Sequence, residues 1–151
     1  MFSLFSKKNK FFNPDEQELI INAIREAEKR TSGEVRVFVE SRCSYVDALD
    51  RAIEIFTEMG MHATEQRNGV LVYVAIKDHQ LAVLGDEGIH QRVGSEYWNN
   101  EVMQMIRGFN RENYAAAIAG CVSDIGKALK EHFPYEDDDK NELSDEIHFG
   151  R

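Results

Sequence analysis

The feature that most constrains the fold is an unbroken apolar run at residues 70–76, in the middle of the chain. The run is rich in β-branched and aromatic residues, which is typical of a central strand covered on both faces. Residues 77–79 supply a reversal, and residues 80–84 give a second short apolar run. The pattern predicts two antiparallel neighbouring strands. The polar residues on either side of this hairpin, 67–68 and 85–88, are therefore expected at one end of the sheet.

The segments before the hairpin predict a parallel crossover unit. Asn13 as a helix cap, Pro14 at the first helical position and an apolar stripe predict a helix to about Arg30. Residues 34–40 alternate with valines on one face, which indicates a strand, and the spacing from Ala52 to Met59 predicts a second helix. Strand, helix and strand in this order form a right-handed βαβ unit. The start of its first strand then lies beside the other two polar segments.

Two further helical stripes, at residues 97–109 and from about 110 to 132, complete the pattern. The fold class predicted is α/β, with a small mixed sheet made of the parallel βαβ unit and the antiparallel hairpin, and with helices on both faces. Residues 1–12 are expected to form an N-terminal arm, 13–134 the α/β domain, and 135–151 an acidic C-terminal tail. In that tail, Ile147 and Phe149 are the residues expected to pin its end to the surface.

Charge is distributed unevenly along the chain. The net charge is −9, but residues 136–146 hold seven acids and one lysine, so the remainder carries only −3. A chain without a basic footprint is not expected to bind nucleic acid. The sequence has no apolar run of the roughly 18 residues that a membrane-spanning helix needs, and no secretory signal pattern. A cytoplasmic, monomeric protein is expected.

Four short motifs along the chain resemble the TPM domain family. These are Thr31-Ser32-Gly33-Glu34-Val35, Arg67-Asn68-Gly69-Val70-Leu71, Gly85-Asp86-Glu87-Gly88-Ile89, and His132-Phe133-Pro134. The resemblance covers about residues 13–134 and implies an α/β sandwich with helices on both faces of a small sheet. It also implies three kinds of activity: acid phosphatase chemistry, calcium binding, and a role in assembling or repairing membrane complexes. Many relatives carry a signal peptide and a transmembrane or Gly-rich tail, and a stand-alone domain without them is expected here.

The acids at the shared end of the sheet predict a metal site. Glu34, Asp86 and Glu87 offer the hard oxygen ligands that Ca²⁺ or Mg²⁺ prefers, and Ca²⁺ is the ion expected first. Main-chain carbonyls of the Gly-containing loops are expected to complete a shell of about six to eight ligands. The alternative needs no ion: Asp86 caps the helix that starts near Glu87, and Glu34 pairs with Arg67. The remaining residues expected to line this pocket are Thr31, Gly33, Asn68, Gly85, Gly88 and Trp98.

Phosphatase chemistry at the same place needs a nucleophile or an activated water and a cation for the phosphoryl oxygens. Asp86 is the candidate nucleophile or metal ligand, and Arg67 is the candidate cation. The sequence contains no DxDx[TV] strand end, no CxxxxxR cradle and no Gly-rich phosphate loop. The leading prediction is therefore a calcium-binding and protein-interaction module with an unidentified protein partner. A metal-assisted acid phosphatase and a membrane-complex assembly factor are the alternatives.

Overall fold

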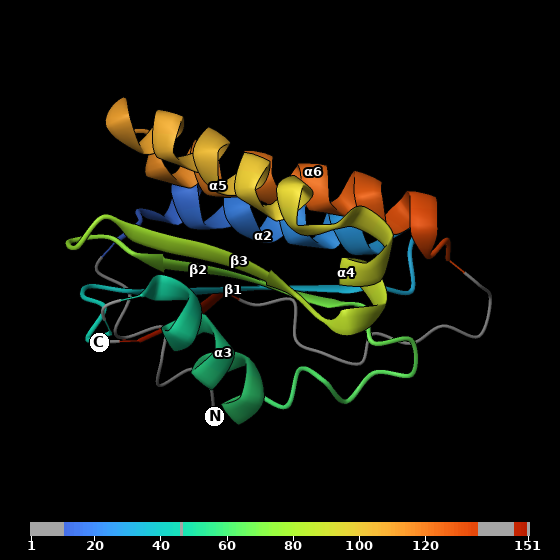
Figure 1. Cartoon of the computed structure of the whole chain (residues 1–151). Coiled ribbons are helices and arrows are strands. Elements are labelled where there is room, and N and C mark those ends of the chain that lie inside the picture. The colour runs from blue at the N-terminus through green and yellow to red at the C-terminus, as the bar shows by residue number, and fades with distance from the viewer. Residues whose placement is uncertain (1–10, 46, 136–146, 151) are drawn as a thin grey trace.

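A four-stranded sheet in the order β3-β2-β1-β4 forms the middle layer of the protein. The computed structural model describes residues 11–45, 47–135 and 147–150 (Figure 1). Strand β1 pairs in parallel with β2 and β4, and β2 pairs antiparallel with β3, so the predicted mixed sheet is confirmed. The elements in chain order are α2 (Pro14–Glu28), β1 (Glu34–Glu40), α3 (Ala48–Glu58), β2 (Gly69–Ala75), β3 (Gln80–Gly85), α4 (Glu87–Val93), α5 (Ser95–Asn110), α6 (Tyr114–His132) and β4 (Ile147–Phe149).

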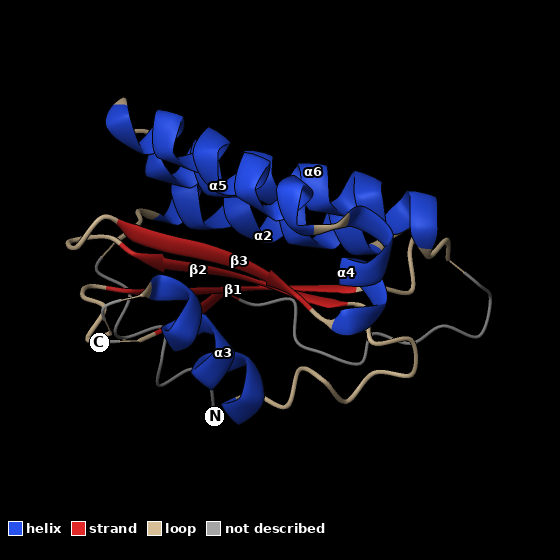
Figure 2. Ribbon diagram, in the orientation of Figure 1, coloured by secondary structure: helices blue, strands red, loops and turns tan. Residues whose placement is uncertain are grey.

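Helices cover both faces of this sheet, as the pattern predicts (Figure 2). Helices α2, α5 and α6 lie together on one face and bury the larger core, which includes the alternating valines of β1. Helix α3 lies on the other face, against β2 and β3. Every residue of β2 is buried, which explains why its sequence is apolar without alternation.

The helix starts follow the cues in the sequence. Asn13 accepts a hydrogen bond from the main-chain N–H of Glu16, and Glu16 accepts one in return from Asn13, which completes a capping box at α2. Asp47 caps α3 and Asp86 caps α4. Each acid satisfies a main-chain N–H that the first turn of a helix leaves unpaired. The starts of these three helices are therefore set by local capping contacts.

The short strand β4 is an addition that the pattern did not predict. Ile147 and Phe149 do more than hold the chain end to the surface, because they pair with β1 and join the main core. Three residues are too few to show a period-two pattern, which is why the sequence did not reveal the strand. Between them His148 is buried, and this burial, with Arg36 nearby, lowers its pKa to about 4. The imidazole in β4 is therefore neutral at pH 7.

The end of the expected N-terminal arm also packs on β4. The rings of Phe11 and Phe12 lie 6.3 and 6.4 Å from the ring of Phe149, measured between centroids. The other aromatic and apolar residues of the arm lie outside the described residues, as does the acidic run 136–146. Among the described segments, no helix combines the length and the apolar character needed to cross a bilayer.

Candidate functional site

Three loops meet at the end of the sheet where β1 and β2 begin and β3 finishes, which is the convergence that strand direction predicts. The main-chain N–H of Glu34 donates to the carbonyl of Asn68 over 3.4 Å, and that of Asp86 donates to the carbonyl of Gly69 over 2.9 Å. The N–H of Gly88 donates to the carbonyl of Arg67 over 2.8 Å. Main-chain hydrogen bonds therefore tie all three segments into one rim, which we call the loop rim (residues 31–34, 66–69 and 85–88).

At the centre of the loop rim, one guanidinium joins two carboxylates. Nε and Nη2 of Arg67 donate to the two carboxylate oxygens of Asp86 over 2.7 and 2.9 Å, and Nη1 lies 3.3 Å from Glu87. The side chain of Asp86 is 6% exposed, whereas those of Arg67 and Glu87 are 41% and 62% exposed. The hydrogen bonds that Arg67 donates to Asp86 also raise the pKa of Arg67 above its usual value. The pair therefore has one fixed member and one member open to solvent.

The local backbone explains why these groups meet. Asp86 also accepts a 2.8 Å hydrogen bond from the N–H of Glu87 as the cap of α4, so its carboxylate cannot rotate freely. Arg67 has a φ of 52°, a left-handed conformation that is uncommon for a residue with a side chain. A Cβ on Gly88 would lie 2.1 Å from the carbonyl oxygen of Gln66, so only glycine allows α4 to start against this loop.

Glu34 belongs to the same end of the sheet but has a different environment. It stands opposite Gly69 in the ladder and is 2% exposed, and its charge acts on the buried Arg36 two residues along β1. Within the part of the chain that the structure describes, no three His, Cys, Asp or Glu residues are grouped so that they could hold a metal ion. Asp86 and Glu87 thus remain as the pair on which a cation site can be proposed.

The other predicted pocket residues divide into structural contacts and rim contacts. Thr31 is 3% exposed, and its hydroxyl bonds to the main-chain carbonyls of Leu129 and Phe133 at the end of α6. A Cβ on Gly33 would lie 2.7 Å from the side chain of Leu129, so this glycine permits close packing of α6 on β1. Both residues therefore hold α6 on the sheet.

Asn68 lies within the loop rim. Its side-chain amide donates to the Ser32 hydroxyl over 3.1 Å, and that hydroxyl lies 3.2 Å from the side-chain oxygen of Gln66. Ser32 and Gln66 were not predicted as site residues, because serine and glutamine in loops are common and carry no distinctive spacing. They connect the start of β1 to the loop before β2.

Gly85, at the end of β3, packs against Trp98 of α5. A Cβ on Gly85 would lie 2.2 Å from the indole ring of Trp98, and the indole N–H donates to Nδ1 of His90 over 3.0 Å. Trp98 is 7% exposed and belongs to the core, and it also lines a hollow along β3. Trp98 was predicted to line the pocket at the loop rim, whereas the hollow that it lines runs along β3.

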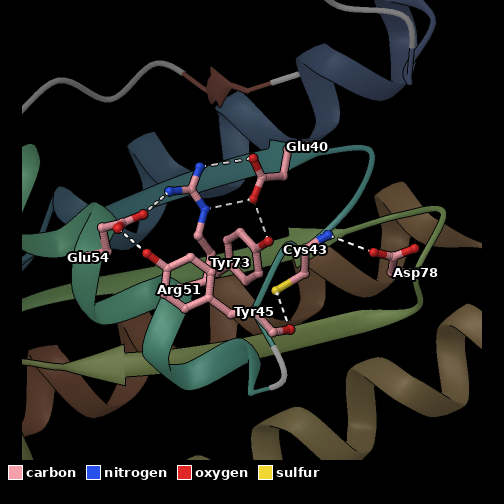
Figure 3. Close-up of polar contacts among 7 residues, drawn as sticks. All are labelled: Glu40, Cys43, Tyr45, Arg51, Glu54, Tyr73 and Asp78. Atoms are coloured by element: carbon pink, nitrogen blue, oxygen red, sulfur yellow. Dashed lines mark hydrogen bonds and ion pairs between the residues drawn. The ribbon is translucent and has the colours of Figure 1, made fainter.

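A second cluster of charges lies at the opposite end of the sheet, where β1 finishes (Figure 3). Nε and Nη2 of Arg51, on α3, donate to the two oxygens of Glu40 over 2.9 and 3.0 Å, and the Tyr73 hydroxyl donates to Glu40 over 2.5 Å. Arg51 also bonds to Glu54, which accepts a hydrogen bond from Tyr45. Burial and the Glu40 contact raise the pKa of Tyr73. This closed cluster was not predicted, because its members come from three elements.

The chemistry available to the loop rim follows from its hydrogen bonds. Nucleophilic attack on phosphorus needs a carboxylate oxygen with a lone pair directed at the substrate. Both oxygens of Asp86 bond to Arg67, and one also bonds to a main-chain N–H. Nucleophilic attack and direct coordination of a metal ion would both compete with the guanidinium for this carboxylate. The cation that the site already holds is the guanidinium of Arg67.

Known proteins share this fold. The model for the TPM domain matches residues 6–128. The solution structure of protein BA42 from the psychrophilic bacterium Bizionia argentinensis is 36% identical, covers 96% of this chain and 99% of its own, and superposes with a TM-score of 0.85. No curated protein matches the chain.

Two more distant structures share the architecture. The N-terminal domain of a protein from P.gingivalis is 16% identical, with 84% of this chain and 83% of that one covered and a TM-score of 0.67. The N-terminal domain of cg2496 from Corynebacterium glutamicum is 12% identical, with 80% and 76% covered and a TM-score of 0.64. At these identities the likeness shows the fold alone.

Proposed function

We propose that this chain, which belongs to the TPM domain family, is a cation-responsive binding domain. In the proposed site, Asp86 and Glu87 exchange the Arg67 guanidinium for Ca²⁺. One observation carries the proposal: a half-exposed arginine lies between two carboxylates at the point where three loops meet. Arg67 already acts as the cation of the site, and its side chain has solvent to move into.

Charge supports the exchange. Asp86 and Glu87 together carry two negative charges, and Arg67 supplies one positive charge, so a divalent ion neutralises the pair more completely. Ca²⁺ accepts six to eight oxygen ligands in flexible geometry, whereas Mg²⁺ demands a strict octahedron and keeps its water. Two carboxylates with main-chain carbonyls and water suit Ca²⁺, with a dissociation constant on the order of 10⁻⁴ to 10⁻³ M.

The exchange would alter the surface that a partner meets. Arg67 is anchored in its loop by a 3.3 Å hydrogen bond from its N–H to the carbonyl of Thr64, and its left-handed φ leaves few conformations for the loop. Release of the guanidinium would remove one of the links between residues 64–67 and α4, while the main-chain hydrogen bond from Gly88 to Arg67 remains, and it would change the charge of the rim. A protein partner would then bind in a calcium-dependent way.

The other two functions implied by the family stay predictions. A metal-assisted acid phosphatase would use the same Asp86 and Arg67. In the structure these two side chains are hydrogen-bonded to each other. A role in assembling membrane complexes has no specific observation to favour it here.

Amide chemical shifts during a calcium titration of the full-length protein test the proposal. We expect the largest shifts at residues 66–68 and 86–88, and we expect the double variant Asp86→Asn, Glu87→Gln to lose them. Asp15→Asn, in the first turn of α2, is the matched control and should leave them unchanged. No shifts, or shifts confined to residues 136–146, would contradict the site.

A further inference from the structure

The outer edge of β3 offers a row of main-chain groups that the sheet does not pair. β3 is an edge strand of six residues, Gln80–Gly85, and contains no proline and no charged residue. Since the N–H of Asp86 donates to Gly69 in β2, alternation along an antiparallel ladder turns the N–H and C=O groups of Leu81, Val83 and Gly85 away from β2. Natural edge strands are usually short, charged or covered. The opposite edge, β4, has only three residues.

This edge forms the floor of a groove. A hollow of about 410 Å³ runs along residues 81–85. Leu49 at the start of α3 forms one wall, and Trp98 and Val102 of α5 form the other. Figure 1 shows β3 between the layers that contain these two helices. Leu49 is 42% exposed, so its apolar side chain is available to a ligand. The groove therefore combines unpaired main-chain groups with apolar walls.

The charge of the groove indicates which side chains a bound segment should carry. Among the lining residues Asp47 is the acidic one, and no lysine or arginine lines the groove. The neighbouring Asp50 on α3 is also exposed and acidic. A segment that fills the groove therefore gains from a basic residue at the end that reaches Asp47.

We propose that the β3 groove binds an extended, alternately apolar peptide segment of a partner protein, which adds to the sheet as a fifth strand and places a lysine or arginine beside Asp47. Strand addition of this kind takes its affinity from main-chain hydrogen bonds and its specificity from pockets for alternate side chains. The groove meets the loop rim at Gly85, and binding of the peptide does not depend on calcium.

Two other occupants fit the charge less well. A second copy would bring β3, QLAVLG, which supplies no basic residue, and its own α3 and α5 would meet those of the first copy. The segment 136–146 of the same chain is strongly acidic and would repel Asp47. Both remain as outcomes that the experiment separates.

Amide hydrogen exchange of the full-length protein tests the proposal with an acetylated hexapeptide amide, Lys-Val-Thr-Val-Thr-Val. At saturating peptide we expect exchange at Leu81 and Val83 to slow at least tenfold, because their N–H groups face the added strand. Ala82 and Leu84 already donate to β2 and should change little. A peptide with N-methyl groups at alternate residues lacks the main-chain donors and should not bind. No protection, or equal protection by the methylated peptide, would overturn the proposal.

Substitution of Asp47 tests the charge. Asp47→Asn keeps a residue that caps α3 well, and we expect it to weaken the lysine peptide about threefold and to leave a glutamine analogue unaffected. Asp50→Asn is the matched control, because Asp50 does not line the groove. An unchanged affinity of Asp47→Asn for the lysine peptide would contradict the proposed contact between Asp47 and a basic residue.

Amide protection measured without peptide separates the other two occupants. Protection that disappears on dilution would identify a second copy as the occupant, and protection that dilution leaves intact would identify the chain itself.

Discussion

The two ends of the sheet each carry an arginine bonded to both oxygens of a buried carboxylate, but the two arginines differ in exposure. Where β1 finishes, the side chain of Arg51 is 20% exposed and that of Glu40 is 7% exposed. At the loop rim, Arg67 is 41% exposed and Asp86 is 6% exposed. In both places the acid is fixed by the fold. The arginine is enclosed at one end and accessible at the other.

This difference separates a structural ion pair from a candidate binding site. Glu40 accepts hydrogen bonds from Arg51 and from the Tyr73 hydroxyl, so strand β1, helix α3 and strand β2 are joined through one carboxylate. Removal of Arg51 would leave the charge of Glu40 buried without its ion-pair partner. At the loop rim the arginine is open to solvent, and the proposed function has an ion take its place. An arginine–carboxylate pair is therefore enclosed at one end of the sheet and open to solvent at the other.

The largest expected effect comes from removing each arginine in turn. We expect Arg51→Met to lower the free energy of unfolding by about 3 kcal/mol, because Glu40 is left buried and charged. Arg67→Met should lower it far less, because water reaches the open side of the pair. Urea unfolding at pH 7 measures both. Equal losses in the two variants would remove the distinction between the two ends.

A third buried acid shows what happens when no arginine is present. Glu101 on α5 is 4% exposed, and its Oε1 has no hydrogen-bond partner in the part of the chain that the structure describes. Burial and the neighbouring Asp124 raise its pKa to about 7. The folded protein therefore binds a proton at Glu101 between about pH 4.5 and 7 that the unfolded chain releases. Stability from this group is present at low pH and is lost as the pH rises through 7.

We expect Glu101→Gln to increase the free energy of unfolding by about 2 kcal/mol at pH 8, because the amide removes the cost of an ionised acid between α5 and α6. At pH 4 the wild type is protonated, and the two proteins should be equally stable. Urea unfolding at both pH values measures the effect. A gain that is the same at pH 4 and pH 8 would show that ionisation is not the cause.

The stability of the cluster around Glu40 also depends on the Tyr73 hydroxyl. Tyr73→Phe removes the 2.5 Å hydrogen bond to Glu40 and should cost about 1.5 kcal/mol, since hydrogen bonds to charged groups are stronger than neutral ones. Tyr45→Phe is the control, because Tyr45 bonds to Glu54 at the surface and should contribute little. If Tyr45→Phe cost as much as Tyr73→Phe, the enclosure of Glu40 would not be what strengthens the contact.

The smallest expected effect tests the cap at the loop rim. Asp86→Ala removes the hydrogen-bond acceptor at the start of α4 and should lower the free energy of unfolding by about 1 kcal/mol. Asp86→Asn keeps an acceptor and should lose less, because both variants lack the ion pair with Arg67 and they differ in the cap. Thermal unfolding of the two variants distinguishes them. A loss in Asp86→Asn as large as the loss in Asp86→Ala would mean that the ion pair, and not the cap, accounts for the effect.

Much of this arrangement follows from local patterns in the sequence. The apolar run at residues 70–76 predicted the central strand, and the strand–helix–strand order predicted which loops meet at the rim. What the pattern missed depends on contacts between distant segments. The pairing of Arg67 with Asp86 was not predicted, because the alternative to a metal site placed Arg67 on Glu34. The Glu40 cluster and β4 also require the folded sheet before their partners can be known.

Calcium affinity measured with and without the rim arginine tests the central proposal most directly. If Arg67 occupies the place of the cation, Arg67→Met removes a competitor and should bind Ca²⁺ more tightly, with the same amides of residues 86–88 shifting at lower calcium concentration. Arg51→Met should leave those amides and the affinity as they are in the wild type. An affinity that is unchanged or weaker in Arg67→Met would contradict the account.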